Sequence, residues 1–531
     1  MRTRALLLAV AAALAASPVA SGADLPMTLD EARARALARN PEVRLERQSV
    51  AISDSAVERA KGAYDVSFKA DARYRDRTDP VNSVLSGAPS GEVGPATYGG
   101  LGNVSLSKLL PTGGAVSLFS SIGRERTNNT FGLLTPSYTT SLGLEVRQPL
   151  LANRAIDPAR KGLSIARIDR SRSLASLARV AAETVAAVER AYWTLSAAAS
   201  DVEARASAVA LAERQRDDVA ARIEAGTQSE ADAAAPVAEL ERRKGELLAA
   251  REALSRAENG LKSLLTDDPA DPVWEARVVP GDVPAEEPEP AVDLASALAE
   301  ARAERPEVAE AAARLERVAV EEKAARDRVL PQLDVVAGLT ARGLSGSQNP
   351  DAISPFPGGV VVPEELQGSL GRSYGTLFEG RFPDASIGLS FALPIGNRVA
   401  KADAAIAASQ REQASISAAA TRLKVEVEVR NAAVALATAR QRVEAARASR
   451  RAAEVLLEAE SERFEAGVTT SFFVLTRQND LTAARIAETA ALADSRKALV
   501  EWARARGALL ADRGIRIEDD APASKPAGGS R

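Results

Sequence analysis

The sequence predicts an α+β membrane protein in which long antiparallel α-helical coiled-coil hairpins continue into strands of a β-barrel that is shared between chains. The segment Arg222-Ile223-Glu224-Ala225-Gly226 returns as Arg463-Phe464-Glu465-Ala466-Gly467, which indicates an internal duplication. Each copy ends one very long helical run and is followed within five residues by another, as at the tip of a helical hairpin. Several other stretches alternate between apolar and polar residues, which is typical of strands.

The composition excludes several classes of function. The 531 residues include no Cys and no His, which removes disulfides, thiol nucleophiles, imidazole bases and most zinc or haem sites. The 72 acidic residues slightly outnumber the 68 basic ones, so nothing indicates a nucleic-acid partner. The sequence shows no nucleophile–base pair or phosphate-binding motif, so we expect neither enzyme activity nor a cofactor.

The first 23 residues have the pattern of a signal peptide. A basic start precedes an apolar run at residues 5–16, and Ser21 and Ala23 supply small residues before a cleavage site. The run is shorter than the ~18–20 residues that a membrane-spanning helix needs, which favours cleavage over anchoring. We therefore expect an exported protein, and any membrane insertion must use strands.

Each copy begins with two helices separated by a proline. Thr28 and Glu31 predict a capping box for a helix that ends before Asn40-Pro41, and the segment around Pro306 repeats this arrangement. These prolines are 265 positions apart, whereas the tip glycines are 241 apart, so the first copy carries 24 extra residues between the landmarks.

The duplication predicts the domain organisation. The expected parts are a signal peptide (1–23), a first repeat (24–266), a Pro-rich acidic linker (267–292), a second repeat (293–511) and a polar C-terminal tail (512–531). Within the repeats we expect helices at 28–62 and 293–328, strands within 64–150 and 331–395, and long helical hairpins at 158–265 and 398–510.

The alternating stretches predict strands with one apolar and one wet face, as at residues 66–74, 141–147 and 386–393. A soluble sandwich would turn the apolar face to a core, whereas a membrane barrel would turn it to lipid. The loops at 78–96 and 345–373 are long and rich in Gly, Ser, Pro and Asn, as in extracellular barrel loops. Aromatic residues at strand ends or in adjacent loops would form a girdle: Tyr64, Tyr74, Tyr98, Tyr138, Tyr374, Phe378 and Phe382.

The number of strands requires several chains. Each copy has about two clear strands, and the 24 extra residues fit a further hairpin at 102–123 whose place in the barrel the sequence leaves open. Four to six strands cannot close a membrane barrel, which needs about eight, and an open edge in lipid is very costly. The barrel must therefore be shared in a ring of chains.

The long helices have a coiled-coil period. The run at 158–225 has 68 residues and would be roughly 100 Å long. Its eleven seam positions from Leu174 to Val209 are spaced 3.5 residues apart on average. We expect return helices at 229–265 and 471–510, with a kink in the first at Pro236.

Taken together, the chain resembles the TolC-like outer-membrane efflux protein family over nearly the whole mature length. The resemblance rests on the duplicated Pro-Glu-Val segments, on Gln148-Pro149-Leu150-Leu151, Leu393-Pro394-Ile395 and Ala191-Tyr192-Trp193, and above all on residues 463–475, which are similar to the family's tip motif. It implies a homotrimer with a 12-stranded barrel in outer-membrane lipid and a periplasmic helical tunnel. It also implies docking onto a periplasmic adaptor (membrane fusion) protein and an inner-membrane pump or secretion ATPase.

The resemblance also assigns roles at the hairpin tips. Asp232 matches an acidic gate position, although a carboxylate there could equally satisfy exposed N–H groups of a helix start. Phe473 replaces the second gate carboxylate, with Phe472 beside it, and either forms a hydrophobic constriction or packs in the interior. The remaining candidates are Ser229 and Thr470, as helix caps at the gate, and Gly226, Thr227, Gly467 and Val468, as adaptor-docking positions.

Two functions follow from these observations. The main expectation is a passive exit channel in the outer membrane, serving a tripartite efflux pump or a type I secretion system. The alternative is a structural periplasmic coiled-coil spacer or tether with a small soluble β-domain and no channel. Only the channel needs strands that face lipid.

Overall fold

The computed structural model describes residues 24–516 except 82, 84, 228, 283–291, 354–360 and 467. The chain divides into two compact units. The helical unit draws on Met1–Ile52, Ser171–Ala313 and Ile416–Arg531, and the sheet unit on Ser53–Arg170 and Arg314–Ser415. The expected signal peptide and residues 517–531 of the expected tail lie outside the described residues.

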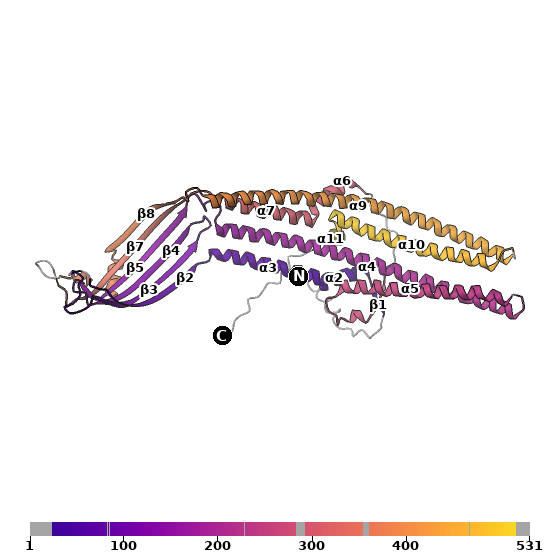
Figure 1. The fold of residues 1–531 in the computed structure, drawn as a ribbon, viewed down its shortest axis with the longest axis horizontal. Coiled ribbons are helices and arrows are strands. Elements are labelled where there is room, and N and C mark those ends of the chain that lie inside the picture. The colour runs from indigo at the N-terminus through magenta and orange to yellow at the C-terminus, as the bar shows by residue number, and fades with distance from the viewer. Residues whose placement is uncertain are drawn as a thin grey trace, which may run out of the picture. The chain divides into compact units, whose positions relative to one another are not determined.

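The sheet unit contains one six-stranded antiparallel sheet (Figure 1). Its strands in spatial order are β2 (Ser67–Thr78), β3 (Ala96–Leu109), β4 (Ala115–Thr127), β5 (Leu134–Pro149), β7 (Gln332–Gln348) and β8 (Phe382–Ala392). The hairpin formed by the 24 extra residues is therefore part of this sheet, as β3 and β4. A 12-stranded barrel built by three chains would need four strands from each, so that expectation does not fit this sheet.

The strand register separates an apolar face from a polar face. One row across all six strands reads Phe68, Leu106, Leu118, Leu144, Leu339 and Ala385. The adjacent row, on the opposite face, reads Ser67, Ser107, Ser117, Glu145, Gly338 and Ser386. The apolar row is not covered by the rest of the chain: Phe68 is 65% exposed and Leu339 is 60% exposed.

The polar face is held together by hydrogen bonds between strands. The Ser67 and Ser107 hydroxyls lie 2.6 Å apart, and the Asn103 amide donates to the Asp71 carboxylate at 2.9 Å. Farther along the sheet, the Arg342 guanidinium donates to Asp384 at 2.6 Å. These groups satisfy one another while remaining accessible to water.

A short helix, α8 (Leu370–Phe378), begins within the stretch 345–373 that the sequence predicts as a loop and continues beyond it. The Thr140 hydroxyl donates to the Ser373 carbonyl at 3.1 Å, and the Leu344 N–H donates to the Thr376 hydroxyl at 3.1 Å. Thr140 is on the apolar face, in register with Ile122, so α8 covers part of that face. Tyr374 and Phe378 therefore belong to this helix and not to strand ends.

The helices are α2 (Leu29–Arg39), α3 (Pro41–Lys61), α4 (Pro158–Glu224), α5 (Ala234–Leu265), α6 (Leu294–Glu304), α7 (Pro306–Asp327), α9 (Arg398–Glu465), α10 (Ser471–Arg506) and α11 (Leu509–Asp512). The Thr28–Glu31 capping box is present at the start of α2. The return helix predicted at 471–510 is interrupted, because Gly507 takes a φ of +82° and ends α10. Within the described ranges, no helix combines the length and apolarity needed to cross a membrane.

The first return helix also starts later than predicted. A 3₁₀ turn, η2 (Glu230–Ala233), precedes α5, which begins at Ala234 and not at Ser229. Pro236 consequently falls in the first turn of α5, where the N–H that proline lacks would have no helical partner. The kink predicted at Pro236 is therefore wrong.

The helical unit also holds a small parallel sheet that the sequence analysis missed. β1 (Asp24–Met27) pairs with β6 (Arg277–Pro280), which lies in the segment expected to be a linker. The buried Tyr192 hydroxyl lies 3.0 Å from both the Met27 carbonyl and the Asp282 carboxylate, and it accepts the Asp282 N–H. Two four-residue strands give no alternating pattern long enough to recognise.

The predicted seam of α4 forms the core of the helical unit. Its buried members are Leu177, Ala181, Val185, Val188, Tyr192, Leu195 and Val209. Val185 packs in one cluster with Val500 from α10 and Leu509 from α11, which joins the two repeats.

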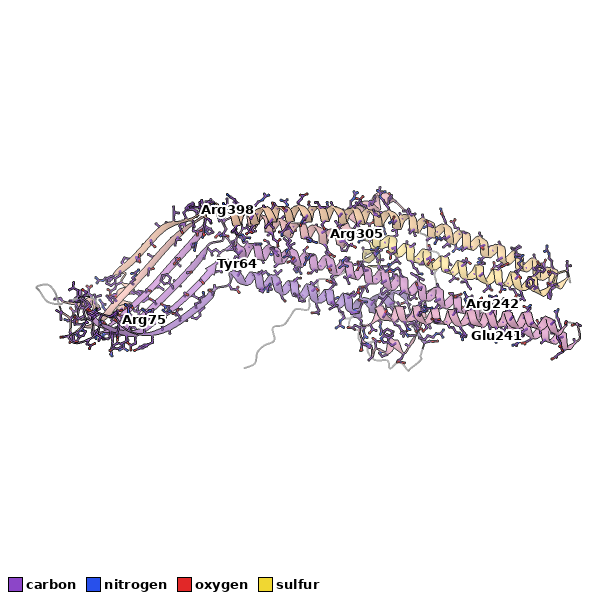
Figure 2. The ribbon with its side chains drawn as sticks, in the orientation of Figure 1. Tyr64, Arg75, Glu241, Arg242, Arg305 and Arg398 are labelled. Carbon is purple, nitrogen blue, oxygen red and sulfur yellow. The ribbon has the colours of Figure 1, made fainter. Side chains whose placement is uncertain are left out.

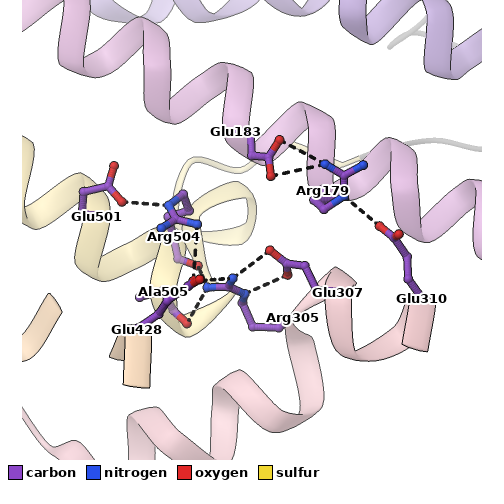
Figure 3. Close-up of polar contacts among 9 residues, drawn as sticks. All are labelled: Arg179, Glu183, Arg305, Glu307, Glu310, Glu428, Glu501, Arg504 and Ala505. Atoms are coloured by element: carbon purple, nitrogen blue, oxygen red, sulfur yellow. Dashed lines mark hydrogen bonds and ion pairs between the residues drawn. The ribbon is translucent and has the colours of Figure 1, made fainter. Parts of the chain in front are cut away.

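A buried arginine connects three helices of the second repeat (Figure 3). The Arg305 guanidinium, at the break between α6 and α7, pairs with Glu307 at 2.7 Å and with Glu428 of α9 at 2.8 Å. It also donates to the Ala505 carbonyl in α10 at 3.2 Å. Burial acts to lower the pKa of Arg305, but its hydrogen bonds with Glu307 and Glu428 outweigh burial and raise that pKa.

We expect Arg305→Ala to lower the free energy of unfolding by about 3 kcal/mol, because two carboxylates and a carbonyl lose their buried partner. Arg302→Ala is the matched control, since Arg302 pairs with Glu426 of the same helix α9 but its side chain is 58% exposed. The control should lose about 1 kcal/mol or less. Urea unfolding followed by circular dichroism measures both, and equal losses would contradict the assignment.

Candidate functional site

The two hairpin tips share one backbone geometry. The Thr227 N–H donates to the Arg222 carbonyl at 2.9 Å, and the Val468 N–H donates to the Arg463 carbonyl at 2.9 Å. Both partners are shifted by 241 positions, so the duplication extends to individual hydrogen bonds. Gly226 has a φ of +72°, as expected for the left-handed residue after a helix. Gly467, its predicted counterpart, lies outside the described residues.

The first tip differs from the predicted capping box. The Ser229 hydroxyl accepts the Ala231 N–H at 3.4 Å, within the 3₁₀ turn η2, whereas Ala233 occupies the N-cap position of α5. Ser229 therefore caps the turn and not the helix. Asp232 lies in η2, but its side chain is outside the described part of the structure. The Thr227 hydroxyl reinforces the tip by donating to the Arg222 carbonyl at 2.8 Å.

At the second tip, Thr470 is the N-cap residue of α10, as predicted, but its side chain makes no capping hydrogen bond. Its carbonyl accepts the Phe473 N–H at 3.1 Å. Phe472 and Phe473 form an edge-to-face pair with ring centroids 5.7 Å apart, and they are 66% and 51% exposed. Within one chain the Phe473 side chain is therefore not buried. Val468 beside them is 78% exposed.

Several contacts join the two hairpins near these tips. The Arg222 guanidinium lies 5.9 Å from the centroid of the Phe464 ring. The Glu239 carboxylate accepts from Arg243 of α5 at 2.8 Å and from Asn479 of α10 at 3.2 Å, and Arg243 also donates to the side-chain amide oxygen of Asn479. We call Glu239, Arg243 and Asn479 the hairpin latch, since they connect α5 to α10.

The Glu239 carboxylate of the latch is ionised at neutral pH. A hydrogen bond from Arg242 lowers the pKa of Glu239 to about 2, against the opposing effect of burial, and Arg243 and Asn479 strengthen the shift. The sequence analysis missed the latch because it joins residues 240 positions apart, and no local pattern marks them. Among the described residues, no group of three or more acidic side chains lies close enough together to hold a metal ion.

Comparisons with known proteins give one family match, over part of the chain, and several similar folds. Residues 297–508 match the model of the family described as outer membrane efflux protein. A comparison with curated proteins finds no match.

The fold is similar to that of several solved channels. The outer membrane channel CmeC of Campylobacter jejuni is 17% identical, with a TM-score of 0.60 over 91% of this chain and 86% of that one. The outer membrane channel MtrE of Neisseria gonorrhoeae is 18% identical, with a TM-score of 0.58 over 91% and 89%. The outer membrane protein VceC of Vibrio cholerae is 14% identical, with a TM-score of 0.59 over 90% and 96%.

The latch predicts an acid limit for the stability of the hairpin pair. Glu239 has a folded pKa of about 2 against 4.5 when unperturbed, so its contribution is full above pH 4.5 and is lost as the pH falls towards 2. That contribution is at most about 3 kcal/mol. Glu239→Gln should therefore lower the free energy of unfolding at pH 7 and flatten its fall between pH 4.5 and 2.

Glu241→Gln provides the matched control, because Glu241 is on the same helix but its side chain is 63% exposed and pairs with Lys244 of the same helix. Figure 2 places Glu241 and Arg242 on α5. Urea unfolding at pH 7 and pH 3 gives the comparison. Identical pH profiles for the wild type and Glu239→Gln would refute the role of the latch.

Proposed function

We infer that this chain is a TolC-like outer membrane efflux protein, and we propose that it forms the outer-membrane exit channel of a tripartite efflux pump or a type I secretion system. The family match and the fold support an exit channel. Such a channel conducts substrates passively from the periplasm or the pump to the exterior. It performs no chemistry of its own, and its partners supply the energy.

The observation that carries this proposal is the exposed apolar face of the sheet, opposite a hydrogen-bonded polar face. Ile387 is 82% exposed and Leu389 is 72% exposed on one edge strand alone. A periplasmic spacer would bury such a face in the core of a soluble β-domain, because a large exposed apolar surface is unfavourable in water. In a membrane barrel, lipid would contact the apolar face and the water-filled lumen would contact the polar face.

We propose that three copies close one barrel. A sheet of six strands is too small for a closed membrane barrel, and its edge strands β2 and β8 have no second partner in the described sheet. If β2 of one copy pairs with β8 of the next, a homotrimer supplies three times six strands. The diameter of a barrel grows roughly linearly with strand number, so this exit would be roughly 1.5 times as wide as one built from four strands per chain.

The proposed partners are inferred from the exposed hairpin tips and from the expected export signal. A periplasmic adaptor protein would dock at the tip turns, where Gly226, Thr227, Gly467 and Val468 lie, and an inner-membrane pump or secretion ATPase would complete the assembly. The exposed Val468 side chain supports a protein contact at this point. Residues 1–23 would direct export and be removed, which leaves the sheet in the outer membrane and a large periplasmic portion. We propose no nucleic-acid partner.

The gate is proposed at the same tips. The candidates are Asp232, Ser229, Thr470, Phe472 and Phe473. Three copies of Asp232 around one axis would attract cations, and their mutual repulsion would favour opening. Three exposed Phe473 side chains would supply an apolar constriction, and the hairpin latch would hold the two hairpins of each chain together.

Conductance in planar lipid bilayers tests the channel. The purified protein should give discrete, ohmic conductance steps, and the spacer alternative predicts none. Protein that fails to conduct and partitions into the aqueous fraction would overturn the proposal.

The acidic gate predicts a change in ion selectivity. Asp232→Asn removes three charges from the proposed ring and should lower the cation-to-anion permeability ratio severalfold, by roughly 1 kcal/mol of charge attraction. Asp217→Asn removes the same charge from an exposed position on α4 and serves as control. The reversal potential in a salt gradient measures the ratio. An unchanged ratio in Asp232→Asn would exclude the carboxylate ring.

A further inference from the structure

The apolar face of the sheet carries a groove of about 470 Å³ in the half nearest the loop at 78–96, which we call the loop side. Gly100 and Gly102 of β3 form its floor, and Tyr74 of β2 and Ile122 of β4 flank them in register. Leu370 of α8 contributes to the rim. The groove is therefore bounded by strands on both sides of β3 and by the helix that covers this end of the apolar face.

No atom of the chain requires a glycine at position 100, whereas a Cβ built at Gly102 would lie 3.3 Å from the Ile122 side chain. A Cβ built at Gly100 would meet no atom closer than the Arg73 carbonyl oxygen at 4.0 Å, and Gly100 is not among the residues with a positive φ. Glycine in a strand is less stable than Ala, because it loses more conformational freedom on folding and offers no side chain to pack. A glycine without a packing reason in a strand marks a place where another molecule approaches the backbone.

An arginine side chain lies at the loop-side end of the groove. Arg124 lies opposite Gly100, with its guanidinium carbon 6.0 Å from the centroid of the Tyr138 ring. Arg126 follows two positions nearer the loops on the same face, in register with Tyr98. Within the part of the chain that the structure describes, no carboxylate pairs with Arg124 or Arg126. Arginine on a lipid-facing strand is costly at the membrane midplane and tolerated near the interface.

The lining of the groove therefore changes along the strands, from apolar residues near the middle of the sheet to a cationic residue near the loops. Ala72, Gly102 and Ile122 form an apolar row towards the middle of the sheet. Tyr74, Gly100 and Arg124 form the next row towards the loops, where Arg75 of the neighbouring pleat is marked in Figure 2. An amphiphile with an apolar tail and an anionic head fits this order, since arginine binds phosphate through two parallel hydrogen bonds.

We propose that this groove binds an acyl chain of lipid A, the phosphorylated lipid of the outer leaflet, with a lipid phosphate held by Arg124. The inference rests on the proposed function, because the loop side faces the exterior only if the sheet belongs to an outer-membrane barrel. The tail lies over Gly100 and Gly102 between Tyr74 and Ile122, and α8 limits it on one side. Bound lipid thereby covers part of the apolar face that the chain itself leaves exposed.

The test measures lipid that stays with the full-length protein after extraction from the outer membrane in mild detergent. Native mass spectrometry counts lipid A per chain, and delipidated protein is then titrated with lipid A and, separately, with phosphatidylglycerol. Wild-type protein should retain lipid A and prefer it to phosphatidylglycerol. Arg124→Gln and Gly100→Leu should each weaken lipid A binding by about tenfold, through loss of the phosphate contact and through filling of the floor.

Gly388→Leu is the matched control. Gly388 is a strand glycine of β8 on the polar face, and a Cβ there meets nothing within 4 Å. Its lipid binding should equal that of the wild type. Equal lipid A affinity in the wild type, Arg124→Gln, Gly100→Leu and Gly388→Leu would overturn the site. If the wild type binds phosphatidylglycerol as tightly as lipid A, the assignment to lipid A is overturned. If the protein conducts but the lipid content of Arg124→Gln and Gly100→Leu equals that of the wild type, only this inference is overturned. A soluble protein that does not conduct would overturn the proposed function as well.

Discussion

The exposed apolar face of an open six-stranded sheet is the constraint on which the rest of the structure depends. Every residue of the edge strands β2 and β8 is exposed, and both strands carry large apolar side chains. Neither the face nor the edges can be satisfied by one chain alone, because water disfavours the first and lipid disfavours the second. In the proposed trimer, neighbouring copies would pair the edges and lipid would cover the face, which resolves both problems together.

The two repeats share hydrogen bonds at their helix breaks and tips, and they differ in the strands that they contribute to the sheet. Asn40 and Arg305 both stand before the helix-starting proline, and each donates to a carbonyl near the end of its return helix, Leu264 and Ala505. Thr227 and Val468 close the tips with the same hydrogen bond. The repeats differ in the hairpin of β3 and β4, which only the first contains and which also provides the glycine floor.

The sequence predicted what depends on repeated local patterns. The 67-residue helix α4 and the 68-residue helix α9 end two residues before the predicted tips at 226 and 467, and the buried seam from Leu177 to Val209 follows the predicted spacing. Features made by single contacts between distant segments were missed, namely β1 with β6, α8 on the sheet, and the hairpin latch. The 24 extra residues indicated a hairpin, but only the strand register shows that it joins the sheet.

The native mass of the protein extracted in mild detergent from the outer-membrane fraction tests the central claim most directly. Our account predicts a trimer that survives extraction, because three six-stranded sheets must close one barrel. A monomer recovered from the aqueous fraction without detergent would contradict it, since the apolar face would then be stable in water. In that case a periplasmic coiled-coil spacer would be the better description of this chain.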